Sequence, residues 1–366
     1  MKFGLVGAGA AGGRIVDRMH GLEGTRERTF SEGNAFVFDT SPEAFEEYAS
    51  VPADRQILLG DTHPDVRGEG TGGDIDTGAD VAREESNEIY REFDGVETNA
   101  LDAILLVAGL GGGTGGGVGP VLLEHLQSIY EVPVYALGIL PHDGEGDERS
   151  LNAARSLPSF VSEAENVLLF DNDAWHTGEG SLEERYPELN DELTRRVVSA
   201  LAAGELDGAS VAENRIDSSD IMRALGTGGV SSVGYASTDI GTDTGLLAWL
   251  RSLLGTDQEE EETDAARTNS LVRRAVNSRL TLPCEIASAE RVLVVLSGPP
   301  SACSRRGFES ARYWLEEEAD TVEVLAGDQP RPGSSRLAAS VILSNVTEVP
   351  RVDELQSRAV AFQTGE

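Results

Sequence analysis

Short apolar runs alternate with longer stretches of helical periodicity over residues 1–175. The apolar runs predict strands at residues 2–6, 35–39, 56–59, 103–107, 132–139 and 166–170. Between them, apolar positions at helical spacing predict helices at about 10–20, 77–93, 116–129 and 148–163. Strands and helices that alternate in this way form a parallel sheet covered by helices. The fold class is therefore α/β, with a Rossmann-like first domain.

The pattern changes beyond that region. A long helix is predicted at 187–203, because Leu189, Leu193, Val197, Val198 and Leu201 share one face. Further helices are predicted at 218–225, 266–280 and 304–319, and strands at 230–237, 291–297, 321–325 and 338–344. The polar, acidic stretch 239–266 predicts a loop. We expect a parallel-sheet domain at 1–185, a central helix at 186–204, a smaller α+β domain at 205–350 and a short tail at 351–366.

The net charge of the chain limits which partners and which solvent conditions it suits. There are 64 acidic and 29 basic residues, so the formal net charge is −35. Such a chain has no basic surface for nucleic acid, and it suits high salt, where self-repulsion is screened. The two cysteines, Cys284 and Cys303, predict free thiols rather than a disulfide framework. We see no signal peptide, membrane span or membrane anchor, and therefore expect a cytoplasmic protein.

Two glycine-rich loops carry the candidate chemistry. The first follows the first strand and opens the first helix, and its sequence fits G-x-G-x-x-G. Its candidate phosphate-binding residues are Gly9, Ala10, Ala11, Gly12 and Gly13. Taken alone, this loop favours NAD, and Asp39 at the end of the second strand would suit a ribose hydroxyl. Tight packing of strand against helix is the alternative to any nucleotide.

The second loop follows the strand at 103–107 and has seven glycines within residues 109–117. So much glycine costs chain entropy, which is tolerated where the backbone must touch a ligand. A nicotinamide enzyme has no use for this second loop, whereas a nucleoside triphosphate does. No lysine follows either loop, so the P-loop grip is absent and backbone amides must hold the phosphates. The candidates are Gly111, Gly112, Gly113, Thr114, Gly115 and Gly116.

Residues 111–117 resemble the GGGTG[ST]G signature of tubulins and FtsZ, and other motifs match that superfamily in order. Segments such as 138–141, 151–155 and 280–285 look most similar to its CetZ group, which is linked to cell shape. The resemblance implies GTP and GDP as ligands, with Mg²⁺ bridging the phosphates and no protein ligand to it identified. It implies a head-to-tail filament of identical subunits. It also adds site residues: Arg14 in the first phosphate loop; Gly70, Thr71 and Gly72 at the γ-phosphate; Glu145 and Arg149 at the ribose; and Asn172, Tyr186 and Asn190 around the base. For Arg149, a surface pair with Asp147 is the alternative.

Asp217 and Asp220 are the candidate catalytic residues. The resemblance implies that they lie in a loop that completes hydrolysis on the next subunit, although Asn214 stands one residue early for that motif. Their spacing of three at a predicted helix start equally fits a cap of the helix N-terminus. Two alternatives to a GTPase filament stay open. One is an assembly scaffold with little turnover, and the other is a nicotinamide-dependent oxidoreductase.

Overall fold

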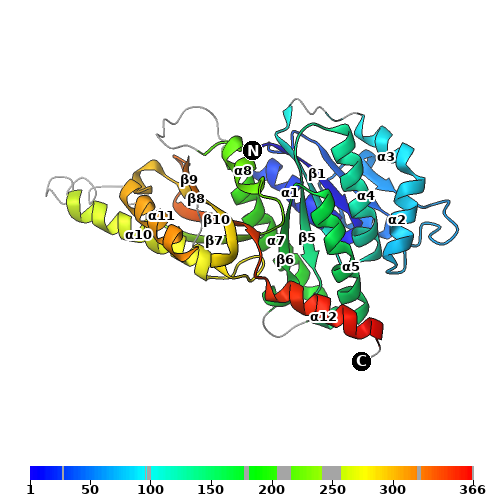
Figure 1. Cartoon of the computed structure of the whole chain (residues 1–366). Helices are drawn as coiled ribbons and strands as arrows, with labels where there is room; N and C mark the ends of the chain where they lie inside the picture. The colour runs from blue at the N-terminus through cyan, green and yellow to red at the C-terminus, as the bar shows by residue number, and fades with distance from the viewer. Residues whose placement is uncertain are drawn as a thin grey trace.

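The computed structural model describes residues 1–26, 29–94, 96, 100–176, 181–203, 216–240, 257–319 and 323–364. Its strands form one ten-stranded sheet in the order β3-β2-β1-β4-β5-β6-β7-β10-β8-β9 (Figure 1). The first six strands pair in parallel, as the alternating pattern predicts. They are β1 (Phe3–Ala8), β2 (Ala35–Asp39), β3 (Gln56–Leu58), β4 (Ala103–Gly109), β5 (Val134–Leu140) and β6 (Asn166–Asp171).

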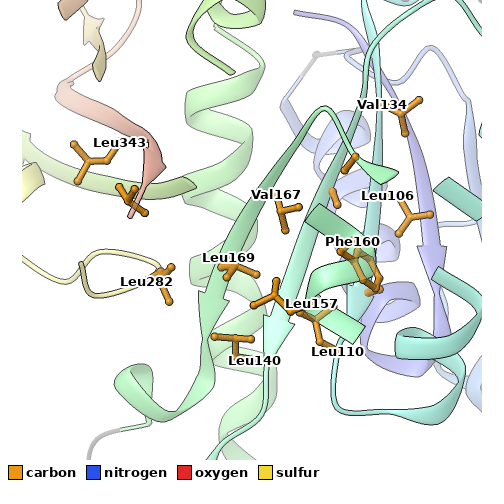
Figure 2. Packing of buried hydrophobic residues seen from close by; sticks show 14 of the residues in the cluster. Leu106, Leu110, Val134, Leu140, Leu157, Phe160, Val167, Leu169, Leu282 and Leu343 are labelled. Atoms are coloured by element: carbon orange, nitrogen blue, oxygen red, sulfur yellow. The ribbon is translucent and has the colours of Figure 1, made fainter. Parts of the chain in front are cut away.

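Helices cover both faces of this parallel sheet. Successive residues of β4 point to opposite faces, so Leu106 joins one hydrophobic core and Leu105 the other. The Leu106 face is covered by α2 (Ile75–Glu84), α3 (Ser86–Phe93), α4 (Gly113–Ile129) and α5 (Asp147–Glu163). Figure 2 shows Leu157 and Phe160 of α5 in this core. The opposite face is covered by α1 (Gly9–Arg26) and the long central helix α7 (Leu182–Leu201).

The second half of the chain extends the same sheet. Val167 and Leu168 of β6 pair in parallel with β7 (Val230–Asp239), which continues into antiparallel pairing with β10 (Arg336–Val346). β10 pairs with β8 (Ala289–Gly298), and β8 pairs in parallel with β9 (Glu323–Pro330). The helices here are α8 (Ser218–Leu225), α10 (Asp257–Asn277), α11 (Arg305–Glu318) and α12 (Pro350–Thr364). In the described part of the chain, no helix is both long and apolar enough to span a membrane.

Three differences from the sequence-based expectation change the elements themselves rather than only their ends. The helix predicted at 77–93 is two helices that meet at Glu85, whose carboxylate turns to accept a hydrogen bond from the amide of Gly60 at 2.9 Å. Part of the predicted loop at 239–266 is helical from Asp257, while 241–256 lie outside the described residues. The predicted short tail forms most of α12, which buries Arg351, Leu355 and Ala359 at spacings of four.

Candidate functional site

A cavity of about 600 Å³ lies at the carboxyl ends of the parallel strands. Residues at or next to the ends of five strands line it, because parallel strands place these ends at one edge of the sheet. Most of the predicted binding residues meet here: Gly9, Ala10, Ala11, Arg14, Asp39, Gly70, Thr71, Gly72, Gly111, Gly112, Gly113, Thr114, Gly115, Glu145, Arg149, Asn172, Tyr186 and Asn190.

Three predicted glycines do not line the cavity. A Cβ at Gly12 would lie 2.1 Å from the carbonyl oxygen of Val107, and one at Gly13 would lie 1.9 Å from the Tyr48 hydroxyl. At Gly116 a Cβ would lie 2.7 Å from the carbonyl oxygen of Leu110. These glycines let α1 and α4 pack closely on their neighbours, which is the packing alternative that the sequence left open for the first loop.

Two helices begin at the cavity. α1 starts at Gly9, and α4 starts at Gly113, three residues before the predicted start and inside the second glycine loop. The first turn of an α-helix leaves backbone N–H groups without partners and carries a partial positive charge. Neither helix has an acidic residue in its first turn to neutralise that charge. The paired N-termini therefore form a site suited to the phosphates of a nucleotide.

Side chains fix the loops around these helix starts. The hydroxyls of Thr40 and Thr114 lie 2.7 Å apart and join the β2 end to the second glycine loop. The amide of Asn152 donates to the carbonyl oxygens of Gly73 at 2.7 Å and Gly111 at 3.2 Å. Asn152, buried on α5, was given no role from the sequence. The sequence carried one signal for such a role: Asn152 falls on the apolar face of the predicted helix at 148–163. A side-chain amide buried there needs hydrogen-bond partners.

Asp39 is a buried carboxyl at the wall of the cavity. One oxygen accepts hydrogen bonds from the backbone amides of Thr40 at 2.7 Å and Ser41 at 3.1 Å. The other oxygen has no partner among the described atoms. Burial raises the pKa of this carboxyl to about 6, although the two amide bonds and the nearby charge of Arg14 act against that shift. The free oxygen can accept a hydrogen bond from a ligand hydroxyl. Arg14 itself is bonded to Glu47 at 2.5 Å.

The opposite end of the cavity carries amides and an aromatic ring. Asn172 is the first residue of α6 (Asn172–Trp175), and Asn190 lies on α7, so two amides from different elements face one cavity. Glu145 accepts a hydrogen bond from the His142 amide at 2.8 Å and lies 3.8 Å from Arg149. Burial, with the nearby charge of Glu145, raises the pKa of Tyr186.

The alternative partner for Arg149 is engaged elsewhere. Asp147 accepts a hydrogen bond from Arg358 of α12 at 2.9 Å. Arg149 lines the cavity, and its guanidinium lies 3.7 Å from the position that a Cβ on Gly112 would take. This places the cation beside the second glycine loop.

Asp217 and Asp220 lie away from the cavity. Asp217 caps α8 by accepting from the amides of Ser219 at 2.9 Å and Asp220 at 3.1 Å, and Asp220 accepts from the Asp217 amide at 3.2 Å. The hydrogen bond from the Ser219 hydroxyl is the main cause of a lowered pKa for Asp217. Both acids thus take the capping positions that their spacing also predicted. Asn214 lies outside the described residues.

The central helix separates these acids from the cavity. α7 is 20 residues, or about 30 Å, long in total. Its first turns, as far as Asn190, line the cavity, and its last turn reaches the amino end of β1. There the amino group of Met1 donates to the carbonyl oxygen of Ala203 at 2.7 Å. The same amino group contributes to the lowered pKa of Asp217, so α8 lies at that end (Figure 1). The cavity and the two acids therefore lie at opposite ends of the molecule.

Comparisons with known proteins agree with this architecture. Residues 2–178 match the family model described as the GTPase domain of the tubulin/FtsZ family, and residues 178–361 match that of the tubulin-like CetZ C-terminal domain. The tubulin-like proteins CetZ1 and CetZ3 of Haloferax volcanii are 44% and 45% identical, each over 99% of this chain, and over 93% and 92% of their own lengths.

Solved structures of two relatives share the fold. The GDP-bound monomer of CetZ1 from Haloferax volcanii matches with a TM-score of 0.85 and 39% identity, over 99% of this chain and 100% of that one. The GTPγS-bound protofilament of CetZ2 from the same organism matches with a TM-score of 0.85 and 34% identity, over 100% of this chain and 99% of that one.

Proposed function

The chain belongs to the tubulin/FtsZ family, in its CetZ group, and we propose that it is a GTP-binding, GTP-hydrolysing protein that polymerises head to tail. The observation that carries this proposal is the cavity at the N-termini of α1 and α4. The first turns of these two helices contain no acidic residue. Anionic phosphate chains are favoured there without a lysine. A cytoskeletal role, in the control of cell shape, is part of the same proposal.

We place the nucleotide along the cavity with its phosphates at the glycine loops. Gly9, Ala10 and Ala11 face the α- and β-phosphates, and the loop at 70–72 faces the γ-phosphate. At the other end, the amides of Asn172 and Asn190 can each donate to and accept from a guanine edge. Glu145 and Arg149 lie at the ribose in this placement, whereas Asp39 lies on the phosphate side, because the carbonyl oxygen of the adjacent Thr40 accepts from the Gly70 amide at 3.0 Å.

In this placement, Mg²⁺ would be bound mainly by phosphate oxygens and water. The carboxylates that line the cavity in the described residues are Asp39, Glu145 and Glu183, and they come from three separate segments. No group of three or more potential metal-ligating side chains gathers in the described part of the chain. Mg²⁺ commonly keeps several waters and binds through phosphate oxygens with few protein ligands. When bound, the ion would neutralise phosphate charge.

Hydrolysis, in this proposal, is completed between subunits. Asp220 lies at the end of the molecule opposite the cavity, so it can approach a γ-phosphate only in another subunit. There its carboxylate would position or deprotonate the attacking water, and Asp217 would hold the start of α8 in place. A contact between two unlike ends repeats without closing and yields a filament.

Two assays on the purified chain in high salt test the proposal. Fluorescence titration with mant-GDP, mant-ADP and NADH should show preference for the guanine nucleotide. Sedimentation should recover more protein in the pellet with GTP than with GDP. Equal binding of mant-ADP would refute the assignment of the base, and preferential binding of NADH would favour an oxidoreductase.

A further inference from the structure

The C-terminal helix α12 carries two arginines that bind the far side of the nucleotide loops. α12 packs against α5 at the lower edge of the molecule, below β6 (Figure 1). Arg351 and Arg358 are seven residues apart and therefore share one face of the helix, two turns from each other. Neither lines the cavity, but both contact the segments that do.

Arg351 joins the ends of two neighbouring strands. Its guanidinium donates to the carbonyl oxygen of Pro141, directly after β5, at 3.0 Å. It also lies 3.3 Å from the carboxylate of Asp171, the last residue of β6. The Arg351 side chain is 6% exposed and that of Asp171 is 3% exposed, so the pair is shielded from solvent. Pro141 lines the cavity, and Asp171 is followed directly by Asn172, which also lines it. The buried Arg351 cation therefore contacts two segments of the cavity lining from outside the cavity.

The ribose loop is held by the same helix. Asp143 pairs with Arg351 at 2.9 Å and also with Arg358, and Asp147 pairs with Arg358 at 2.9 Å. These two aspartates flank Glu145, which lines the cavity. Two cations of one helix thus fix three carboxylates that bracket the base and ribose segments.

We infer that Arg351 is a positioning residue for the nucleotide: it sets the distance between the base-facing Asn172 and the loop at 141–147. The inference rests on the proposed function. A planar guanidinium can satisfy several fixed acceptors at once, which a lysine ammonium does with less geometric control. The contacts of Arg351 and affinity for guanine nucleotide are therefore coupled, because the bound nucleotide requires the loop positions that Arg351 maintains.

Because removal of Arg351 alone leaves Asp171 buried and unpaired, the test uses a double variant. Arg351→Met with Asp171→Asn removes both charges, keeps a capping oxygen at the start of α6, and should fold with a Tm near that of the unmodified chain. We expect its Kd for mant-GDP to rise about tenfold, the effect of losing one charge-assisted hydrogen bond. The ratio of mant-ADP to mant-GDP dissociation constants should fall, since the base contact is the one displaced.

Leu355→Ala is the matched control. Leu355 is buried on the same helix, so its truncation weakens the docking of α12 while both arginines stay. The Leu355→Ala variant should discriminate between mant-GDP and mant-ADP as well as the unmodified chain does. An unchanged Kd and ratio in the double variant would overturn the positioning role, as would an equal loss of discrimination in Leu355→Ala. If the unmodified chain failed to prefer mant-GDP, the proposed function itself would be wrong.

Discussion

At the scale of single residues, Gly112 offers the cleanest way to block the phosphate site. Gly112 lines the cavity, its φ is −88°, and a Cβ there would have its nearest neighbours at 3.7 Å and 3.8 Å. A side chain at Gly112 is therefore tolerated by the fold but occupies the cavity wall. We expect Gly112→Val to weaken mant-GDP binding at least about tenfold with little change in Tm.

Gly113→Val provides the contrast. A Cβ at Gly113 would lie 2.2 Å from the Thr71 hydroxyl and 2.7 Å from the Asp74 amide, so this variant should lose stability as well as binding. Thermal unfolding of both variants, followed by circular dichroism without nucleotide, distinguishes loss of stability from loss of binding. Equal destabilisation by Gly112→Val would argue that Gly112, too, is a packing glycine.

Asp39 gives the cavity a predictable response to pH. Its carboxyl has a pKa of about 6 in the folded chain, whereas an unfolded aspartate titrates near 4. The folded state binds the proton more tightly, so its stability is greatest at low pH and falls as pH rises from about 4 to 6. Asn at this position cannot ionise. We therefore expect Asp39→Asn to gain stability relative to the unmodified chain across this window, by at most about 3 kcal/mol.

The measurement is urea unfolding of both proteins at several pH values between 4 and 8. Asp171, whose pKa is also raised to about 6 by burial, is present in both proteins and cancels in the difference. A difference that does not vary with pH would mean that folding does not raise the pKa of Asp39.

The glycines show how far sequence reasoning reaches at this scale. The first glycine loop was predicted from its spacing and the second from its glycine content, and Gly9, Gly112 and Gly115 of these loops line the cavity. The sequence could not separate these from Gly12 and Gly13, because the atoms that crowd them belong to Val107 and Tyr48, far away in the chain. Which glycine serves a ligand and which serves packing is decided by tertiary contacts.

At the scale of elements, the cap of α8 has a measurable effect. Asp217 accepts two backbone amides at the start of this helix, and an unsatisfied N-cap usually costs about 0.5–2 kcal/mol. We expect Asp217→Ala to lower the free energy of unfolding by that amount and Asp217→Asn, which retains the accepting oxygen, to lower it far less. Urea unfolding checks both. An unchanged free energy of unfolding in Asp217→Ala would mean that the cap does not stabilise α8.

Elements with strong local signals matched the sequence prediction, and others did not. α8 was predicted with its observed bounds, because Asp217 provides a cap and Ile221, Ala224 and Leu225 form its buried face. α12 was not predicted as a helix. Its buried face includes Arg351, a charged residue that apolar periodicity does not count. Asp143 and Asp171, which pair with Arg351, come from segments far away in the sequence.

At the scale of the whole molecule, α7 sets the separation between the cavity and α8. Its first turns line the cavity, and its last turn ends beside Met1, near α8. Even from Asn190, the last residue of α7 that lines the cavity, the rest of the helix spans about 16 Å, too far for an internal reaction. The proposed sharing of hydrolysis between two subunits rests on this separation, because Asp220 does not line the cavity of its own subunit.

The most direct test is the GTPase rate per subunit as a function of protein concentration. We expect turnover per subunit to rise with concentration in the unmodified chain. We also expect Asp220→Asn, which keeps an oxygen for the Asp217 amide, to bind mant-GDP normally yet hydrolyse GTP poorly. Mixing Asp220→Asn with the binding-deficient Gly112→Val should restore part of the activity, because the second protein offers an intact Asp220 to the first protein's GTP. Turnover per subunit that stays constant on dilution, or full activity of Asp220→Asn alone, would contradict the shared site.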